Sequence, residues 1–333
     1  MRRSSLLPPL TLSLLLLAGD VPAQPSGPLA SGLAALAASD YKKAESELAQ
    51  VKGAAEPEAR IGLARAAFEQ GRYADAEKHA LAAAGPASTK ARAGVLRAEI
   101  LLAQGKTREA MALLETLKSG KNADARRARI LLGEALIASG KRADADDPLK
   151  KVIDDYNDNT INSQTDAEGL AQVGRAAFLL RSPKDANTAF KESERVDKKR
   201  VETLLWEAEL FLDKYDPGHA AEVTREALEL APKRADALVM MARVKLEQTL
   251  DFDDAHKLVT EALAIHPRHT GAFAVRAGLA LRDMDIERAD KAIAEGLATN
   301  PNDLELLSIK AAARFLDDDL PGFDAQKKAV FAK

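Results

Sequence analysis

Cysteine is absent from the 333-residue sequence. Its absence excludes a disulfide framework, a cysteine-ligated zinc site, an iron–sulfur cluster, a thiol nucleophile and a lipidated cysteine. Aromatic residues are scarce at 4%, and the runs of Val, Ile and Thr that would favour a sheet are missing. The remaining composition is rich in Ala, Leu, Glu, Lys and Arg, which lose little side-chain freedom in a helix. We therefore expect an all-α protein.

The chain also lacks an excess of charge of either sign, since its net charge is only −3. It therefore has no basic field to attract nucleic acid. There is no HExxH zinc-peptidase motif, and Gly105-Lys106-Thr107 is not a phosphate-binding loop because Ile100 stands where the earlier glycine is required. We predict a protein that is not an enzyme and has no catalytic residues, no cofactor and no metal site.

The first 23 residues have the pattern of a secretory signal peptide. Arg2 and Arg3 precede an apolar stretch over residues 6–18, and Val21-Pro22-Ala23 offers small residues for cleavage after Ala23. The stretch is shorter than the roughly 20 residues that span a bilayer, although an uncleaved anchor is the alternative. We therefore predict an exported protein, periplasmic or secreted, with no transmembrane segment in the mature chain.

A short phrase recurs along the rest of the chain: a turn, an often bulky residue, one or two charges, then alanine. Examples are Gly71-Arg72-Tyr73-Ala74-Asp75-Ala76 and Gly140-Lys141-Arg142-Ala143-Asp144-Ala145. The intervals between the alanines are 32, 34, 35, 41, 34, 35 and 34 residues. The eight alanines are Ala44, Ala76, Ala110, Ala145, Ala186, Ala220, Ala255 and Ala289.

Two further features keep the same period. A small residue precedes the alanine by twelve positions in seven copies, which would let two helices approach closely, and proline follows it by twelve in three later copies. These prolines cannot continue a helix, so each separates one copy from the next. The small residues are Gly32, Ala64, Ala98, Gly133, Gly174, Ala208 and Ala277; the prolines are Pro232, Pro267 and Pro301.

This pattern resembles the tetratricopeptide repeat, a helix pair with a period of 34 residues. The resemblance covers roughly residues 28–332, although Ala, Leu or Phe mostly replace the family's Trp and Tyr. It implies a right-handed α-solenoid of eight to nine helix pairs over residues 24–333. The 41-residue interval predicts an insertion loop near 156–166, and residues 302–333 form a terminal, incomplete repeat.

Other candidate sites are weak. His266 and His269 are three residues apart but flank Pro267, so we interpret them as two solvated histidines at a turn. Asp155 and Asp166 begin and end a segment that partly matches a calcium loop, but its central glycine is missing. Trp206 is expected to pack in the core, because aromatic residues at helical spacing usually do.

The resemblance implies that the first helix of each pair lines a concave groove with its second, fifth, ninth, twelfth and thirteenth positions. The apolar fifth positions lack the Lys and Asn of the family's carboxylate clamp, so chaperone-tail binding is not expected. The charged ninth positions form neighbouring pairs, Arg65 with Glu99, Glu134 with Arg175, and Glu209 with Arg243. Either these pairs tie adjacent repeats together, or their alternating charges recognise a peptide; both interpretations stay open.

We accordingly expect a non-catalytic scaffold or adaptor of the cell envelope that binds a protein or peptide partner in this groove. The alternatives are the interaction segment of a longer exported zinc peptidase, whose catalytic domain would follow residue 333, and an assembly factor for outer-membrane or pilus machinery. The sequence names neither the partner nor the oligomeric state.

Overall fold

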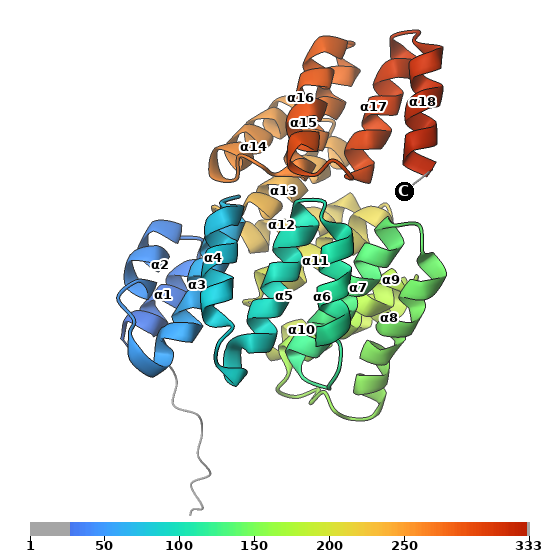
Figure 1. Ribbon diagram of the computed structural model, residues 1–333. Coiled ribbons are helices and arrows are strands. Elements are labelled where there is room, and N and C mark those ends of the chain that lie inside the picture. Colours follow the sequence, from blue (N-terminus) through green and yellow to red (C-terminus); the bar gives the residue numbers. More distant parts are fainter. Residues whose placement is uncertain (1–26, 332–333) are drawn as a thin grey trace, which may run out of the picture.

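The computed structural model describes residues 27–331, and over this range it contains helices and no strand. The α-helices form nine consecutive antiparallel pairs (Figure 1). The first helices of the pairs are α1 (Pro28–Ala37), α3 (Glu56–Glu69), α5 (Ala87–Ala103), α7 (Ala123–Ala138), α9 (Ala167–Leu179), α11 (Val201–Asp213), α13 (Ala235–Gln248), α15 (Thr270–Arg282) and α17 (Leu304–Leu316). The second helices are α2 (Tyr41–Leu48), α4 (Tyr73–Ala83), α6 (Thr107–Leu117), α8 (Arg142–Asn157), α10 (Pro183–Val196), α12 (Pro217–Leu230), α14 (Phe252–Ile265), α16 (Ile286–Thr299) and α18 (Leu320–Phe331). A short 3₁₀ helix, Gly53–Ala55, precedes α3.

The predicted α-solenoid is confirmed, and the small residues have the expected role. All eight periodic alanines are fully buried near the starts of the second helices. Added Cβ atoms at Gly133 and Gly174 would lie 2.7 Å from Leu149 and 2.5 Å from Phe190, on the partner helix of the pair. The helices of these pairs therefore pack so closely that a larger residue at either glycine would have to displace the facing side chain.

The predicted insertion is partly helix and partly an anchored loop. The second helix α8 is longer than most of its counterparts and ends at Asn157, so the loop occupies residues 158–166. Ile161 is buried in the hydrophobic core, and Asp166 accepts a hydrogen bond from the backbone of Gly169 at the start of α9. The loop is therefore held at both its middle and its end.

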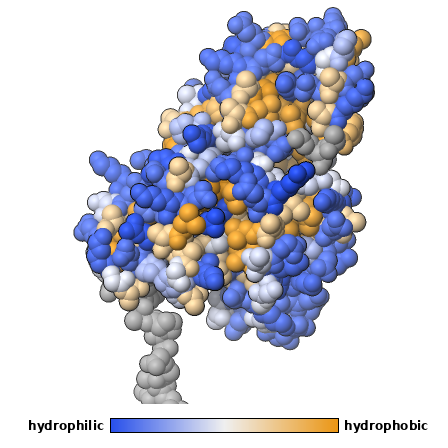
Figure 2. All heavy atoms as spheres, in the orientation of Figure 1, coloured by the Kyte–Doolittle hydropathy of each residue, from blue (hydrophilic) through white to orange (hydrophobic). Residues whose placement is uncertain are grey.

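The solenoid completes one superhelical turn and then packs on itself. Figure 1 shows α1–α12 as a lower layer and α13–α18 as an upper layer. On the face shown in Figure 2, hydrophilic atoms predominate and apolar ones lie in bands between them. Turns within the first three pairs contact the junctions between pairs that lie about 195 residues later in the chain. We call these contacts the seam; it joins residues 39–41, 71–73 and 105 to residues 233, 266 and 300–302.

Hydrogen bonds between side chains and backbone groups hold the two ends of the seam. At one end, the amide of Lys233 donates to Ser39 Oγ at 2.8 Å, and the Tyr41 hydroxyl donates to the Lys233 carbonyl at 3.3 Å. At the other end, Asn302 Nδ2 donates to the carbonyl of Gly105 at 2.8 Å. Each of the three proline-containing junctions thus rests on a turn of the layer below.

The middle of the seam corrects the prediction that His266 and His269 are solvated. His266 is 8% exposed, packs edge-on against Tyr73 with 5.7 Å between ring centroids, and lies against Gly71. The His269 ring caps α15 and bonds Asp236 at 3.0 Å. Burial, reinforced by the neighbouring His269, lowers the pKa of His266 to about 4, so the ring is neutral at pH 7.

Candidate functional site

The inner surface of the lower layer is hollowed into a cavity of about 590 Å³, which we call the groove cavity. Its walls come from six first helices, α1, α3, α5, α7, α9 and α11. Ile61, Val95 and Ala171, at fifth positions of the repeat, supply apolar lining. The volume lies within the range of known ligand pockets.

Two of the three predicted charge pairs form. Arg65 Nη1 lies 2.6 Å from Glu99 Oε2, and Arg175 Nη2 lies 2.7 Å from Glu134 Oε1. The guanidinium of Arg175 also bonds Glu209 at 2.7 Å, because a planar fork can serve two carboxylates at once. Arg243 instead bonds Glu305 of α17 at 2.6 Å, so the predicted pair of Glu209 with Arg243 is wrong.

Sequence reasoning missed the second positions of the repeat, which also carry charge. They are three residues before the fifth positions, so the same register would have found Glu58, Arg92, Arg127, Glu168 and Glu202. All five line the groove cavity, and Arg92 pairs with Glu58. The inner surface therefore has two rows of charged side chains rather than one.

Arg127 links these rows across the groove. Its guanidinium bonds Glu99 at 2.9 Å and Glu202 at 2.8 Å, and so connects α5, α7 and α11. Together with Arg65 this makes a continuous Arg–Glu–Arg–Glu chain. Burial alone would raise the pKa of Glu99, but the two arginines outweigh it and hold the pKa at about 2. The ion pairs therefore join four first helices, α3, α5, α7 and α11.

Trp206 lies in the wall of the groove cavity and is only partly in the core. The side chain packs against the cluster that contains Phe190 and Phe178, and the guanidinium groups of Arg127 and Arg175 lie 5.1 Å and 5.8 Å from the ring centroid. The prediction of a packed residue is thus correct in part, because the same side chain also lines the groove cavity.

Asp124 differs from the other charged residues of the groove cavity. It is half-buried in the first turn of α7, and within residues 27–331 it makes no ion pair. Burial raises its pKa, with Glu58 adding to the effect and Arg92 opposing it. The cavity walls thus hold one carboxylate that the protein's own cations leave available.

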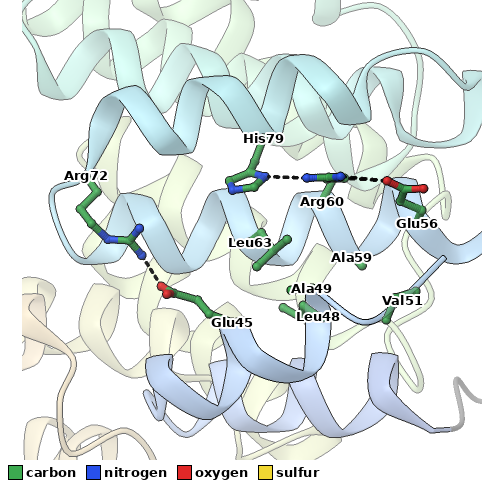
Figure 3. Close-up of a pocket in the computed structure, with 10 residues that line it drawn as sticks. All are labelled: Glu45, Leu48, Ala49, Val51, Glu56, Ala59, Arg60, Leu63, Arg72 and His79. Carbon is green, nitrogen blue, oxygen red and sulfur yellow. Dashed lines mark hydrogen bonds and ion pairs between the residues drawn. The ribbon is translucent and has the colours of Figure 1, made fainter.

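A smaller hollow of about 220 Å³ lies between α2, α3 and α4 (Figure 3). Leu48 and Leu63 form its apolar side, while the drawn polar groups bond one another: Arg60 lies 3.4 Å from His79 and 2.9 Å from Glu56. Burial and the neighbouring Arg60 lower the pKa of His79. A guanidinium beside the ring makes this histidine a poor metal ligand.

The partial calcium-loop match also has a structural explanation. Asp155 bonds Arg129 at 2.7 Å and Asp166 bonds Arg126 at 3.1 Å, so arginines already occupy both end carboxylates. Within the described part of the chain, no group of three or more His, Cys, Asp or Glu side chains could hold a metal ion. No helix of residues 27–331 combines the length and apolarity that crossing a bilayer requires.

Stacked helix pairs around a groove define a helical-repeat solenoid, and comparison with known proteins identifies its family. The family model described as tetratricopeptide repeat matches residues 29–91 and 95–159. The matched residues, which cover the first four helix pairs, are therefore tetratricopeptide repeats, and the later pairs continue the same arrangement of stacked helices. No curated protein sequence gives a match.

Solved structures agree at the level of fold. The Cut9–Hcn1 hetero-tetramer of the APC/C has a TM-score of 0.59 at 15% identity, over 87% of this chain and 56% of that one. A tetratricopeptide repeat protein from Parabacteroides merdae has a TM-score of 0.48 at 17% identity, over 76% and 96% of the two chains. PilF of Pseudomonas aeruginosa has a TM-score of 0.43 at 17% identity, over 62% and 90%. The last two TM-scores are too low to support the assignment of the fold.

Proposed function

We propose that this protein is a non-catalytic scaffold of the cell envelope that binds a protein partner in the groove cavity. The observation that carries the proposal is the cavity itself, because its lining combines apolar fifth-position side chains, Trp206 and an available carboxylate. Extended concave surfaces are what solenoids offer to partners, and specific complexes need apolar contacts beside a few charges.

The charge arrangement narrows the chemistry of the partner. Glu99, Arg127 and Arg175 are committed to bonds within the protein, so the row of alternating charges is not free to recognise a peptide. Asp124 is the carboxylate left for a ligand. We therefore expect an extended segment that presents a Lys or Arg side chain to Asp124 and an apolar side chain to the neighbouring wall.

The decisive variant is Asp124→Lys, which reverses the available charge without breaking an ion pair. Asp144→Lys is the matched control, because Asp144 also lies in the first turn of a helix, α8, but is exposed and outside the groove cavity. Both variants lose the same favourable interaction with a helix N-terminus. Glu99→Arg is unsuitable, since it would place a third guanidinium beside Arg65 and Arg127.

The measurement is crosslinked capture of partners from the envelope of the producing cell, followed by binding of synthetic peptides that match the captured segment with Lys or norleucine. We expect Asp124→Lys to weaken capture and lysine-peptide binding at least tenfold, about 1.4 kcal/mol. Asp144→Lys should bind like the wild type. Equal binding by both variants would rule out the groove cavity as the site.

The proposed place in the cell envelope depends on the signal-peptide prediction for residues 1–23, which lie outside the described residues. Cell fractionation and N-terminal sequencing test it directly. The expected mature chain begins at Gln24, and a full-length chain in the cytoplasm would contradict this part of the proposal.

A further inference from the structure

The turn inside each helix pair puts one residue into the left-handed region of backbone space. This conformation costs most L residues roughly 1 kcal/mol, whereas glycine adopts it freely. The residues at this position have φ between 53° and 71°, and they are Ser39, Gly71, Gly105, Gly140, Arg181, Tyr215, Leu250, Met284 and Asp318.

Three consecutive pairs place a large apolar residue at this strained position. Tyr215, Leu250 and Met284 are 91%, 66% and 61% exposed, respectively. Backbone strain and exposure of apolar surface both disfavour these residues, and each would be relieved by glycine. Such outliers concentrate at functional sites, and grouped exposed apolar residues mark interaction surfaces. We call this row the apolar edge.

The equivalent positions in the first three pairs already have a partner. Ser39, Gly71 and Gly105 are the residues of the lower layer on which the upper layer rests at the seam. The apolar edge belongs to pairs six to eight, so it is the same surface one superhelical turn later. Within residues 27–331 no further turn covers it.

The apolar edge and the opposite edge of the lower layer also carry charges of opposite sign. The turn segments that contain the apolar edge, 213–216, 250–254 and 283–287, hold eight acidic residues and a single basic one, Lys214. Five of these acids pair with nearby cations, and the other three, Asp251, Asp253 and Glu287, make no ion pair within residues 27–331. The junctions between pairs on the opposite edge of the lower layer, 49–55, 84–90 and 118–122, hold four lysines and no acid. The seam has the same signs, since Arg234 of a junction pairs with Glu69 at the end of α3, next to a turn.

We propose that a second copy of this chain stacks on the apolar edge, with the junctions of its lower layer resting on Tyr215, Leu250 and Met284. The contact repeats between molecules the relation that the seam makes within one molecule. It joins two different surfaces, so it is a head-to-tail contact and can extend beyond a dimer. The proposal does not depend on the groove cavity.

The main test is sedimentation velocity of the mature protein over a range of concentrations, at low and at physiological salt. Wild type is expected to form dimers and higher species that weaken as salt rises, because opposite charges face each other. The combined variant Tyr215→Gly, Leu250→Gly, Met284→Gly should fold at least as stably as wild type and stay monomeric. Leu81→Ala, which removes an exposed leucine of α4, is the control and should associate like wild type.

A second variant tests the opposite surface. Lys52→Glu with Lys90→Glu changes two exposed lysines that make no ion pair among the described residues, and it should also be monomeric. Mixed with the triple-glycine variant, it should form a 1:1 complex that grows no further, since each retains one intact surface. A wild type that is monomeric at every concentration and salt, a triple-glycine variant that still associates, or a mixture without the 1:1 complex would each overturn the proposal.

Discussion

Acid should loosen the seam through His266. The pKa of this ring is about 4 in the folded protein, against about 6.5 in an unfolded chain. Between these values the unfolded state binds the extra proton, so stability falls as the pH drops from 6.5 towards 4. A change from pH 7 to pH 4.5 covers about 2 pH units of this window. Since the free energy of unfolding falls by about 1.4 kcal/mol per pH unit, the total loss approaches 2–3 kcal/mol.

His266→Asn isolates this contribution. Asn300 occupies the equivalent place in the next repeat, where its Oδ1 accepts from the amide of Asn302, just as His266 Nδ1 accepts from the amide of Arg268. The substitution therefore keeps the turn hydrogen bond and removes the titrating ring. The other groups near the seam, among them Asp236 and His269, are the same in both proteins, so the difference between the two proteins reports on the residue at position 266.

The assay is urea unfolding of both proteins at several pH values, together with amide exchange of residues 71–73. Repeat arrays can unfold in stages, so the exchange data report on the seam locally. The wild type should lose about 2 kcal/mol more than His266→Asn between pH 7 and 4.5. Parallel loss in the two proteins would refute the reasoning.

Three other substitutions test the packing and charge of the solenoid. Glu99→Gln should destabilise the fold by about 2 kcal/mol at pH 7 in chemical unfolding, because it leaves Arg65 and Arg127 without the carboxylate between them. Because the pKa of Glu99 is about 2 in the folded protein, the difference in stability between wild type and variant should shrink as the pH falls from about 4.5 towards 2. Burial raises the pKa of Glu207 to about 9, with Glu194 adding to the effect, so the native state keeps a proton that the unfolded state releases and stability falls as pH rises from about 4.5 to 9. Glu207→Gln should lack this fall, and between pH 5 and 8 its stability should gain up to about 4 kcal/mol relative to wild type; a constant difference would contradict the assignment. Gly174→Ala should lower the stability by about 2 kcal/mol, since the new methyl would meet the Phe190 ring, and an unchanged thermal midpoint would show that the ring can move aside.

The sequence predicted those features of the structure that involve one repeat or two adjacent repeats. The 34-residue period predicted the helix pairs, and the small residues twelve positions before the periodic alanines lie where the two helices of a pair approach closely, as at Gly133 and Gly174. The register rule also placed Arg65 beside Glu99. It would have found Arg127 and Glu202 as well if it had been applied to the second positions.

The seam could not be predicted in this way. It depends on small rotations that accumulate over six pairs, and no local pattern reports their sum. For the same reason His266 was taken for a solvated residue and Arg243 was assigned to Glu209. His266 contacts Tyr73 of the lower layer, and Arg243 bonds Glu305 two helix pairs further along the chain, so both contacts depend on how the solenoid curves.

The seam makes the position of each helix pair depend on how many pairs precede it, which is not the case in an open solenoid. Units of an open array can be duplicated or deleted one at a time, since each needs only its two neighbours. Here the removal of one helix pair between Gly105 and Lys233 would shift the upper layer by a whole repeat, so that every proline-containing junction would meet the wrong turn below. The number of repeats in this part of the chain is therefore fixed, because only this number brings each junction of the upper layer onto the turn of the lower layer that it contacts.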